Sequence, residues 1–298
     1  MQINRHGHVP RPVRAVRHPQ NGRRSQGQDA PGTHPYGCHG VHGFTLVELL
    51  VVVAIIGLLL GALLPGLSAA QRAALDVKCR NNLRNLGLGV KAYCAMSRGL
   101  FPPQVCSQDW TKPPRYWWGA DSQPPDFSAG LLTASLDVEA GHEDTLYDCP
   151  MQPWGTYVPQ SVTGRPTTTY GYNGYYLCPP MSGWEFAIGR QLRRTQTTVQ
   201  DAGQVFMFAD TMLNWGGGVV GNTCLLDPPW LFDGANWTEN EYTTVCFRHS
   251  GRANVCFVDG HVDGVEPTRI YDAQAMTGYA GESNAPYYVP DYKQWVKQ

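Results

Sequence analysis

The chain has 298 residues, of which 42% are hydrophobic, and its formal net charge is −1. This length allows one large domain or two ordinary ones, and the hydrophobic content excludes a disordered protein. The charge is unevenly distributed, because residues 1–43 hold six arginines and a single aspartate. The remainder is mildly acidic and has no basic stripe, so the composition gives no indication of nucleic-acid binding.

Residues 1–43 are rich in Arg, His, Pro and Gly and have no helical or strand periodicity. They end abruptly where an apolar run begins, which is typical of an unstructured leader that is removed from the mature protein. A translation start at Val41 would shorten this leader to three residues, and the sequence leaves both starts open.

Nineteen residues without a charge run from Leu49 to Leu67. As a helix they would extend about 28 Å, close to the roughly 30 Å of a bilayer core, so one membrane span is predicted. The arginine-rich leader indicates a cytoplasmic N-terminus. A secretory signal peptide cut after Ala70 and a permanent anchor without assembly remain alternatives. Glu48, directly before the uncharged run, is costly in lipid unless its charge is offset.

The pattern changes after Pro65 from uniformly apolar to a single apolar stripe at spacings of three and four residues. Arg98 and Gly99, followed by two prolines, indicate the end of this helix. The sequence therefore predicts one helix from about Phe44 to Arg98. The stripe on its second half consists of Leu75, Cys79, Leu83, Leu86, Val90 and Tyr93.

The sequence beyond residue 98 is rich in Pro, Gly and aromatic residues and contains short strand-like runs. Asp259-Gly260 between alternating apolar residues predicts a type I′ hairpin turn. Together with the long helix, these runs predict an α+β fold with an antiparallel sheet. Residues 126–136 predict a further helix, and strands are predicted within 170–176, 204–210, 243–249 and 253–265.

Eight of the nine cysteines follow the predicted span, an even number that favours disulfides in an oxidising compartment. Their spacing suits no zinc motif. Eight cysteines allow 105 connectivities, so any specific pairing is a hypothesis. Cys79 with Cys149 would join the helix to the domain, and Cys246 with Cys256 would face each other if the chain reverses around Gly251. Proximity and elimination add Cys94 with Cys106 and Cys178 with Cys224.

A set of His and Asp residues in the predicted strands is the main candidate for chemistry. Asp210, His249, Asp259 and His261, with Asp263, could bind a divalent ion or act in acid–base catalysis if their strands are neighbours. The structural interpretation is favoured, in which Asp259 serves a tight turn and His249 bridges a strand to that hairpin. We therefore expect no catalytic site, no cofactor and no metal.

The stretch "GFTLVELLVVVAIIGLLLGALLP", residues 43–65, resembles the N-terminal segment of type IV prepilins and type II secretion pseudopilins. "HSGRANVCFVDG", residues 249–260, is similar to a His-x9-Asp-Gly motif associated with prepilin-type processing. The segments "CRNNLRNLGLG", "YDCP" and "YGYN", at residues 79–89, 147–150 and 170–173, resemble the same bacterial subgroup, so the likeness extends over most of the chain.

The resemblance implies that prepilin peptidase cuts between Gly43 and Phe44, followed by possible N-methylation of Phe44. It also implies that Glu48 neutralises the N-terminal amine of a neighbouring subunit and that Pro65 lies within the helix. The expected product is a non-enzymatic pilin or pseudopilin subunit in a homo- or hetero-oligomeric fibre. The expected parts are the leader (1–43), the helix (44–98) and a periplasmic β-rich domain (99–298), anchored in the inner membrane. A membrane-anchored hydrolase or glycan-binding protein is the alternative.

Overall fold

The computed structural model describes residues 43–106, 113–120, 122, 126–136, 146–152, 167–178, 193–214, 220–232 and 236–289. The predicted leader, except for Gly43, lies outside the described residues. The chain divides into two compact units, Met1–Ile56 and Gly57–Gln298. The second unit holds the sheet and the part of the long helix that packs on it.

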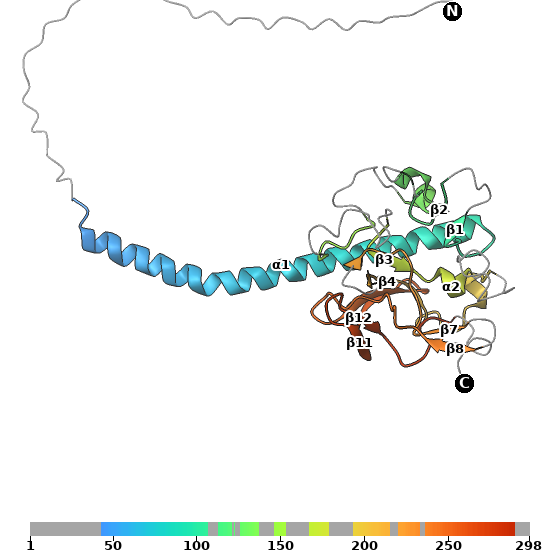
Figure 1. The fold of residues 1–298 in the computed structure, drawn as a ribbon. Helices are drawn as coiled ribbons and strands as arrows, with labels where there is room; N and C mark the ends of the chain where they lie inside the picture. Colours follow the sequence, from blue (N-terminus) through green and yellow to red (C-terminus); the bar gives the residue numbers. More distant parts are fainter. Residues whose placement is uncertain are drawn as a thin grey trace, which may run out of the picture. The chain divides into compact units, whose positions relative to one another are not determined.

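Helix α1, Leu46–Met96, is a single helix of 51 residues and continues through Pro65 (Figure 1). Its bounds lie two residues inside the predicted ones at each end. It is the one helix in the described part of the chain that is long and apolar enough to cross a membrane. Its end is closed by Gly99, which has φ +81° and whose N–H donates to the Cys94 carbonyl.

The N-terminus of α1 is closed by a reciprocal cap between Thr45 and Glu48. The Glu48 carboxylate accepts hydrogen bonds from the Thr45 backbone N–H at 2.8 Å and from the Thr45 hydroxyl at 2.7 Å, and the Thr45 hydroxyl accepts one from the Glu48 N–H at 3.2 Å. This arrangement satisfies backbone donors that a helix start otherwise leaves unpaired. Glu48 thus caps the helix start, a local role beyond the one expected from the sequence.

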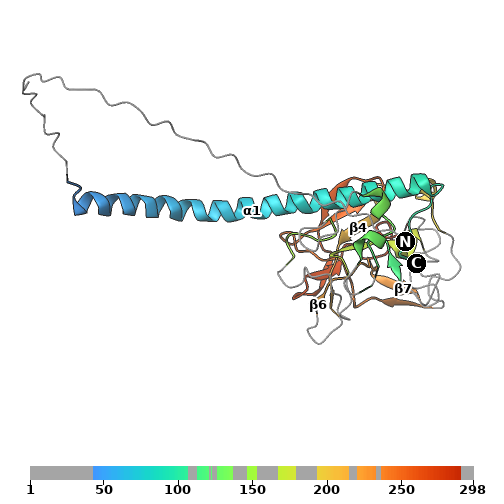
Figure 2. The ribbon, with the colours of Figure 1, turned by 90° about the horizontal axis from the view of Figure 1, so that it is seen from above.

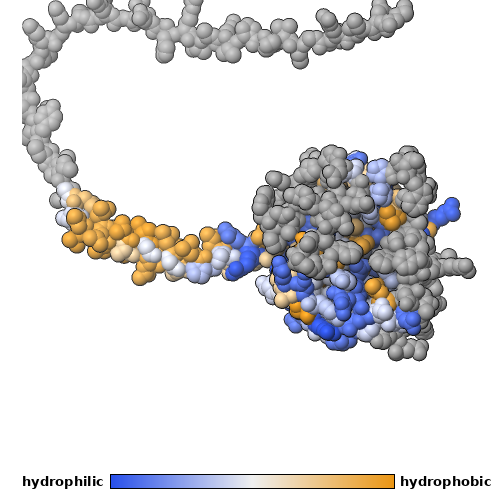
Figure 3. All heavy atoms as spheres, viewed as in Figure 1, coloured by the Kyte–Doolittle hydropathy of each residue, from blue (hydrophilic) through white to orange (hydrophobic). Residues whose placement is uncertain are grey.

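The two halves of α1 differ in their surroundings. Up to residue 75 every described side chain of the helix is exposed, and hydrophobic residues surround its N-terminal part (Figure 3). In the second half an apolar stripe is fully buried, which confirms most of the predicted stripe, although Leu75 is 37% exposed. The stripe residues that are fully buried are Cys79, Leu83, Leu86 and Val90.

A four-stranded antiparallel sheet in the order β10-β9-β4-β3 forms the centre of the second unit. Figures 1 and 2 show the second half of α1 beside it. The helix approaches the sheet closely at Gly87, where a Cβ atom would lie 2.6 Å from Cys256 Sγ. The four strands are β3 (Tyr170–Tyr172), β4 (Phe206–Asp210), β9 (Ala253–Phe257) and β10 (Val262–Val265).

Two hydrophobic clusters lie against this sheet. The first joins the α1 stripe to Trp117, Tyr147 and Phe208, and the second contains Phe206 and Val255. Because the sheet is covered on both sides, its central strands β4 and β9 are buried at every position. An α+β fold with one long helix and an antiparallel sheet is thereby confirmed.

Short elements complete the described part of the chain. The strand pairs β1-β2, β5-β6, β7-β8 and β11-β12 are antiparallel. The bounds are β1 Val105–Cys106, β2 Arg115–Tyr116, η1 Phe127–Ala129, η2 Thr133–Ser135, α2 Gly174–Leu177, η4 Gln196–Thr198, β5 Leu213–Asn214, β6 Val220–Gly221, β7 Trp230–Phe232, β8 Trp237–Glu239, β11 Arg269–Asp272 and β12 Thr277–Tyr279.

The helix predicted at 126–136 is wrong. The segment instead forms two single 3-10 turns, η1 and η2, separated by Gly130 in an extended conformation. The N–H groups of Leu131 and Leu132 donate to the carbonyls of Tyr116 and Trp117. Because these donors bond to a neighbouring segment, a continuous helix does not form. The predicted strand at 243–249 is likewise reduced to isolated bridges, such as Thr211 with Val245.

Candidate functional site

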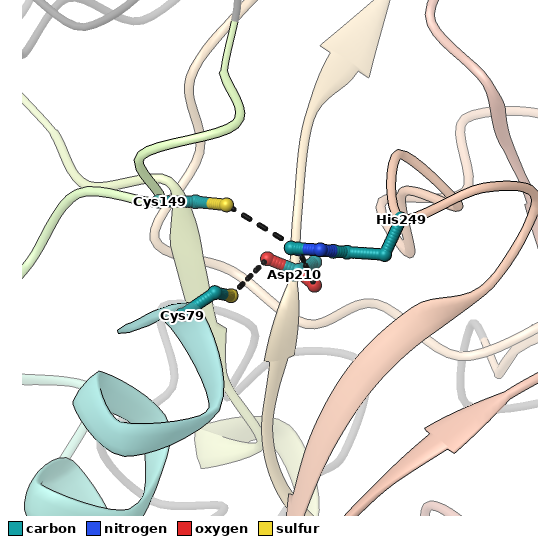
Figure 4. Close-up of side chains that lie close together, drawn as sticks. All are labelled: Cys79, Cys149, Asp210 and His249. Carbon is teal, nitrogen blue, oxygen red and sulfur yellow. Dashed lines mark hydrogen bonds and ion pairs between the residues drawn. The ribbon is translucent and has the colours of Figure 1, made fainter. Parts of the chain in front are cut away.

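Four buried side chains from distant parts of the sequence meet beside α1 (Figure 4). The Cys79 thiol lies 3.4 Å from Asp210 Oδ1, and Cys149 Sγ lies 3.4 Å from His249 Nε2. His249 Nε2 is also 3.1 Å from Asp210 Oδ2. One donor atom from each side chain lies within 4.8 Å of all the others. We call Cys79, Cys149, Asp210 and His249 the buried cluster.

Each member of the buried cluster is positioned by a different element. Cys79 lies on the buried stripe of α1, and Asp210 is the last residue of β4. His249 opens a tight turn to Arg252, with hydrogen bonds in both directions between their backbones. Cys149 lies in a loop, and its backbone N–H donates to Thr169 Oγ1 at 2.5 Å. Thr169 is the residue directly before β3.

A second layer of polar groups supports the buried cluster. The Tyr170 hydroxyl donates to Cys79 Sγ at 3.4 Å, and the Asn254 N–H donates to Asp210 Oδ2 at 2.8 Å. Asp76 Oδ1 lies 2.8 Å from His249 Nδ1, close enough for an ion pair although not aligned as a hydrogen bond. Asp76 also accepts a hydrogen bond from Asn254 Nδ2. The Cys79, Asp210 and His249 side chains are therefore held in place by polar groups outside the buried cluster.

A buried guanidinium completes the charge distribution. The Arg248 side chain is 1% exposed, and its Nη1 lies 4.0 Å from Asp210 Oδ1. Its Nε donates to Cys246 Sγ at 3.3 Å, and its Nη2 donates to the Thr211 carbonyl. A charge this deeply buried requires a partner, and the Asp210 carboxylate lies within ion-pair distance of it.

The electrostatics of the buried cluster favour the charged forms of Asp210, His249 and Cys149 and the neutral form of Cys79. Burial alone would raise the pKa of Asp210, but hydrogen bonding to His249 and the charges of His249 and Arg248 lower it. Burial alone would lower the pKa of His249, but the Asp210 carboxylate raises it to about 10. Burial opposes ionisation of Cys149 as well, yet contacts with Cys79, His249 and Arg248 lower its pKa to about 6. The pKa of Cys79 is raised by its burial.

The structure changes the list of candidate ligands. Of the residues predicted from sequence, it brings Asp210 and His249 together, whereas Asp259 and His261 lie apart from them at the β9-β10 hairpin. Asp259 Oδ1 instead contacts His261 Nδ1 at 2.6 Å. The sequence interpretation missed Cys79 and Cys149 as possible ligands because their spacing follows no metal-binding motif. The sequence did contain a signal for these ligands. The segments "CRNNL" and "YDCP" and the His-x9-Asp-Gly motif each supply one residue of the buried cluster.

The His-x9-Asp-Gly motif spans strand β9, with its two ends at opposite ends of the strand. His249 contacts Asp76 on α1, and the carbonyl of Asp259 accepts a hydrogen bond from Lys91, also on α1. These two helix positions are about 22 Å apart along the axis. The prediction that His249 bridges to the hairpin is therefore wrong, because its imidazole contacts the buried cluster instead. The motif fixes both ends of β9 to the helix.

The predicted type I′ turn at Asp259-Gly260 is also wrong. Cys256 pairs with Val262, and the Phe257 N–H donates to the His261 carbonyl, which leaves a loop of the three residues 258–260. Within that loop only Gly260 has a positive φ, +95°. The Gly260 N–H donates to the Phe257 carbonyl, as in a type I turn followed by a left-handed glycine. Two consecutive positive φ angles, as a type I′ turn requires, occur at Ser250 and Gly251.

Replacing Gly260 with valine is expected to lower the free energy of unfolding by about 1–3 kcal/mol, because a β-branched residue is strained at this φ. A Cβ at Gly260 would also lie 2.6 Å from Lys91 Nζ. Gly251→Val is the matched control, since its φ is +85° but a Cβ there meets nothing within 4 Å. Chemical denaturation should give the larger loss for Gly260→Val. Equal losses would show that the Lys91 contact contributes nothing.

None of the four predicted disulfides is present in the structure. Cys79 and Cys149 do converge, but as thiols within the buried cluster. Cys246 and Cys256 pack in different clusters, Cys256 against Gly87 of the helix and Cys246 with Met212 and Ala275. Cys246 forms a bridge with Thr277, whereas Cys256 pairs with Phe208 and Val262, so the chain reversal at Gly251 does not bring the two cysteines face to face. Neither Cys94 with Cys106 nor Cys178 with Cys224 is bonded.

The N-terminal segment is accessible in the first unit. Gly43 and Phe44 are exposed and precede the capped start of α1, and Phe44 is 70% exposed. A Cβ at Gly43 would meet no atom within 4 Å. Packing within the chain therefore does not require glycine at position 43.

Comparison with known protein families gives a match at this end of the chain. Residues 38–64 match the family described as the prokaryotic N-terminal methylation motif. The match supports a type IV pilin-like protein that prepilin peptidase processes and that is anchored by its N-terminal helix. Neither the curated proteins nor the solved structures include a significant match.

Proposed function

We propose that this protein is a structural subunit of a type II secretion pseudopilus or a type IV pilus-like fibre. Prepilin peptidase removes residues 1–43, and the new N-terminus at Phe44 enters the fibre with its helix. Before assembly the apolar half of α1 holds the chain in the inner membrane, with the leader cytoplasmic and residues 99–298 periplasmic. Its partners are the peptidase and other pilin-like subunits.

The observation that carries this proposal is the unburied apolar half of α1. Its large side chains from Leu46 to Leu67 are between 45% and 75% exposed. Apolar surface of this extent requires lipid or other apolar helices around it. The methylation motif at residues 38–64 supports both lipid before assembly and other apolar helices after it. The motif belongs to proteins that are cut before their N-terminal helix and then assembled.

The buried cluster supports a structural role for the domain. Its four side chains are at most 6% exposed, so a substrate has no access to them in this conformation. A catalytic site needs an accessible group within hydrogen-bond reach of the substrate. The hydrolase interpretation therefore finds no support in this cluster.

The test of the proposal is N-terminal processing. Co-expression of the full chain with a prepilin peptidase should yield a protein that begins at Phe44, with or without an added methyl group, as measured by intact mass. Gly43→Val is the control variant, and it should remain uncut although its Cβ disturbs no contact of the folded chain. A mature start at Gln71, or an uncut parent chain, would contradict the proposal.

A further inference from the structure

We propose that the buried cluster is a closed tetrahedral site for one divalent metal ion of the zinc class. This inference is independent of the proposed fibre function. It rests on the donor types, on their mutual distances and on the groups that surround them.

The donor set suits zinc. Two thiolates, one imidazole nitrogen and one carboxylate oxygen are the atoms that tetrahedral Zn²⁺ sites use. Sulfur donors disfavour Mg²⁺ and Ca²⁺, which prefer oxygen ligands. The four donors come from α1, from the loop at residue 149, from the end of β4 and from the turn at residue 249, and Figure 4 shows their side chains pointing toward one another.

The distances fit the edges of a coordination tetrahedron. With Zn–S of about 2.3 Å and Zn–N or Zn–O of about 2.0–2.1 Å, the sulfur–nitrogen and sulfur–oxygen edges are about 3.6 Å, and the nitrogen–oxygen edge is about 3.4 Å. Cys149 Sγ lies 3.4 Å from His249 Nε2, Cys79 Sγ lies 3.4 Å from Asp210 Oδ1, and His249 Nε2 lies 3.1 Å from the other carboxylate oxygen, Asp210 Oδ2. One donor atom from each of the four side chains lies within 4.8 Å of all the others, so small side-chain movements would bring the four donors around an ion at their centre.

The surroundings are those of a metal site. His249 coordinates through Nε2 and has a carboxylate, Asp76, 2.8 Å from its other ring nitrogen. The Tyr170 hydroxyl donates to Cys79 Sγ, which stabilises a thiolate there. Three negative ligands around a doubly charged ion leave one net negative charge, and the buried Arg248 guanidinium offsets it.

The site is structural because it has four protein donors and is enclosed. All four positions of a tetrahedral ion are taken by side chains, so none is left for water or substrate. The ion would connect Cys79 on α1 to three segments of the domain. We infer that it fixes the second half of the long helix to the sheet.

Metal content and spectroscopy of the full chain in detergent test this inference. The protein, purified without chelator and incubated with Zn²⁺ before desalting, should retain about one zinc per chain by elemental mass spectrometry. Replacement by Co²⁺ should give the intense visible bands of tetrahedral cobalt and a near-ultraviolet thiolate-to-cobalt charge-transfer band. Removal by chelator and reloading with Zn²⁺ alone should restore the stoichiometry.

Two variants and a control assign the ligands. Cys149→Ser and Asp210→Asn should each lower zinc retention at least about tenfold. Cys94→Ser should retain zinc like the parent, because Cys94 is a buried α1 cysteine outside the cluster. The cobalt spectrum of the parent assigns thiolate ligands even if a variant fails to fold.

Three results would overturn the inference. The first is a parent chain that retains no zinc after incubation. The second is an octahedral cobalt spectrum without the thiolate band. The third is a disulfide between Cys79 and Cys149 in protein alkylated at the moment of lysis and mapped without reduction, because a bridge removes both thiolate ligands.

Discussion

Glu48→Val is expected to abolish incorporation into a fibre while leaving membrane insertion intact. Insertion should not suffer, because a charge next to the apolar segment is lost. Assembly should fail because the amine of Phe44 in a neighbouring subunit would then have no carboxylate partner in an apolar fibre core. The measurement is site-specific crosslinking of subunits in membranes and in sheared fibre fractions.

The conservative variant Glu48→Gln separates the two roles of this side chain. Glutamine can keep the cap on Thr45, because a capping box accepts either residue, but it carries no charge. If charge pairing is essential, Glu48→Gln should fail to assemble as Glu48→Val does. If only the cap matters, Glu48→Gln should assemble like the parent, and assembly of both variants would contradict each role.

Asp210→Ala is expected to be the most destabilising single change in the domain, by about 3–5 kcal/mol of unfolding free energy. The substitution removes the carboxylate that faces Arg248 and His249, so the buried guanidinium loses its carboxylate partner and the imidazole loses one of its two. Denaturant unfolding of the full chain in detergent, followed by tryptophan fluorescence with chelator present, measures this effect. The chelator ensures that the loss reports on the protein's own charges.

Asp259→Ala provides the matched control for this prediction. The Asp259 side chain is 45% exposed and contacts a half-exposed His261, so its loss should cost about 1 kcal/mol or less. Similar losses of unfolding free energy for the two aspartates would show that Arg248 and His249 do not offset the cost of burying the Asp210 carboxylate. The charged network around Asp210 would then not stabilise the fold.

Local patterns determined the elements that the sequence predicted well. The helix Leu46–Met96 follows from an uninterrupted apolar run and a three-to-four spacing, and Gly99 with the prolines after it fixes the end. Strands β4 and β9 follow from short apolar runs bounded by turn residues. The processing segment was also readable, because its residues are contiguous and the methylation motif matches them directly.

Only the tertiary structure decided where distant side chains meet. The Cys79 thiol and the Asp210 carboxylate are separated by 131 positions, and Cys149 and His249 by 100, so no local pattern relates them. The segment at 126–136 has helical spacing, but two of its backbone N–H groups donate to the carbonyls of Tyr116 and Trp117 in an adjacent segment of the same chain. The cysteine pairings failed for the same reason. Sequence spacing limits the reach of the chain, whereas packing of α1 on the sheet determines which thiols, carboxylates and imidazoles lie together.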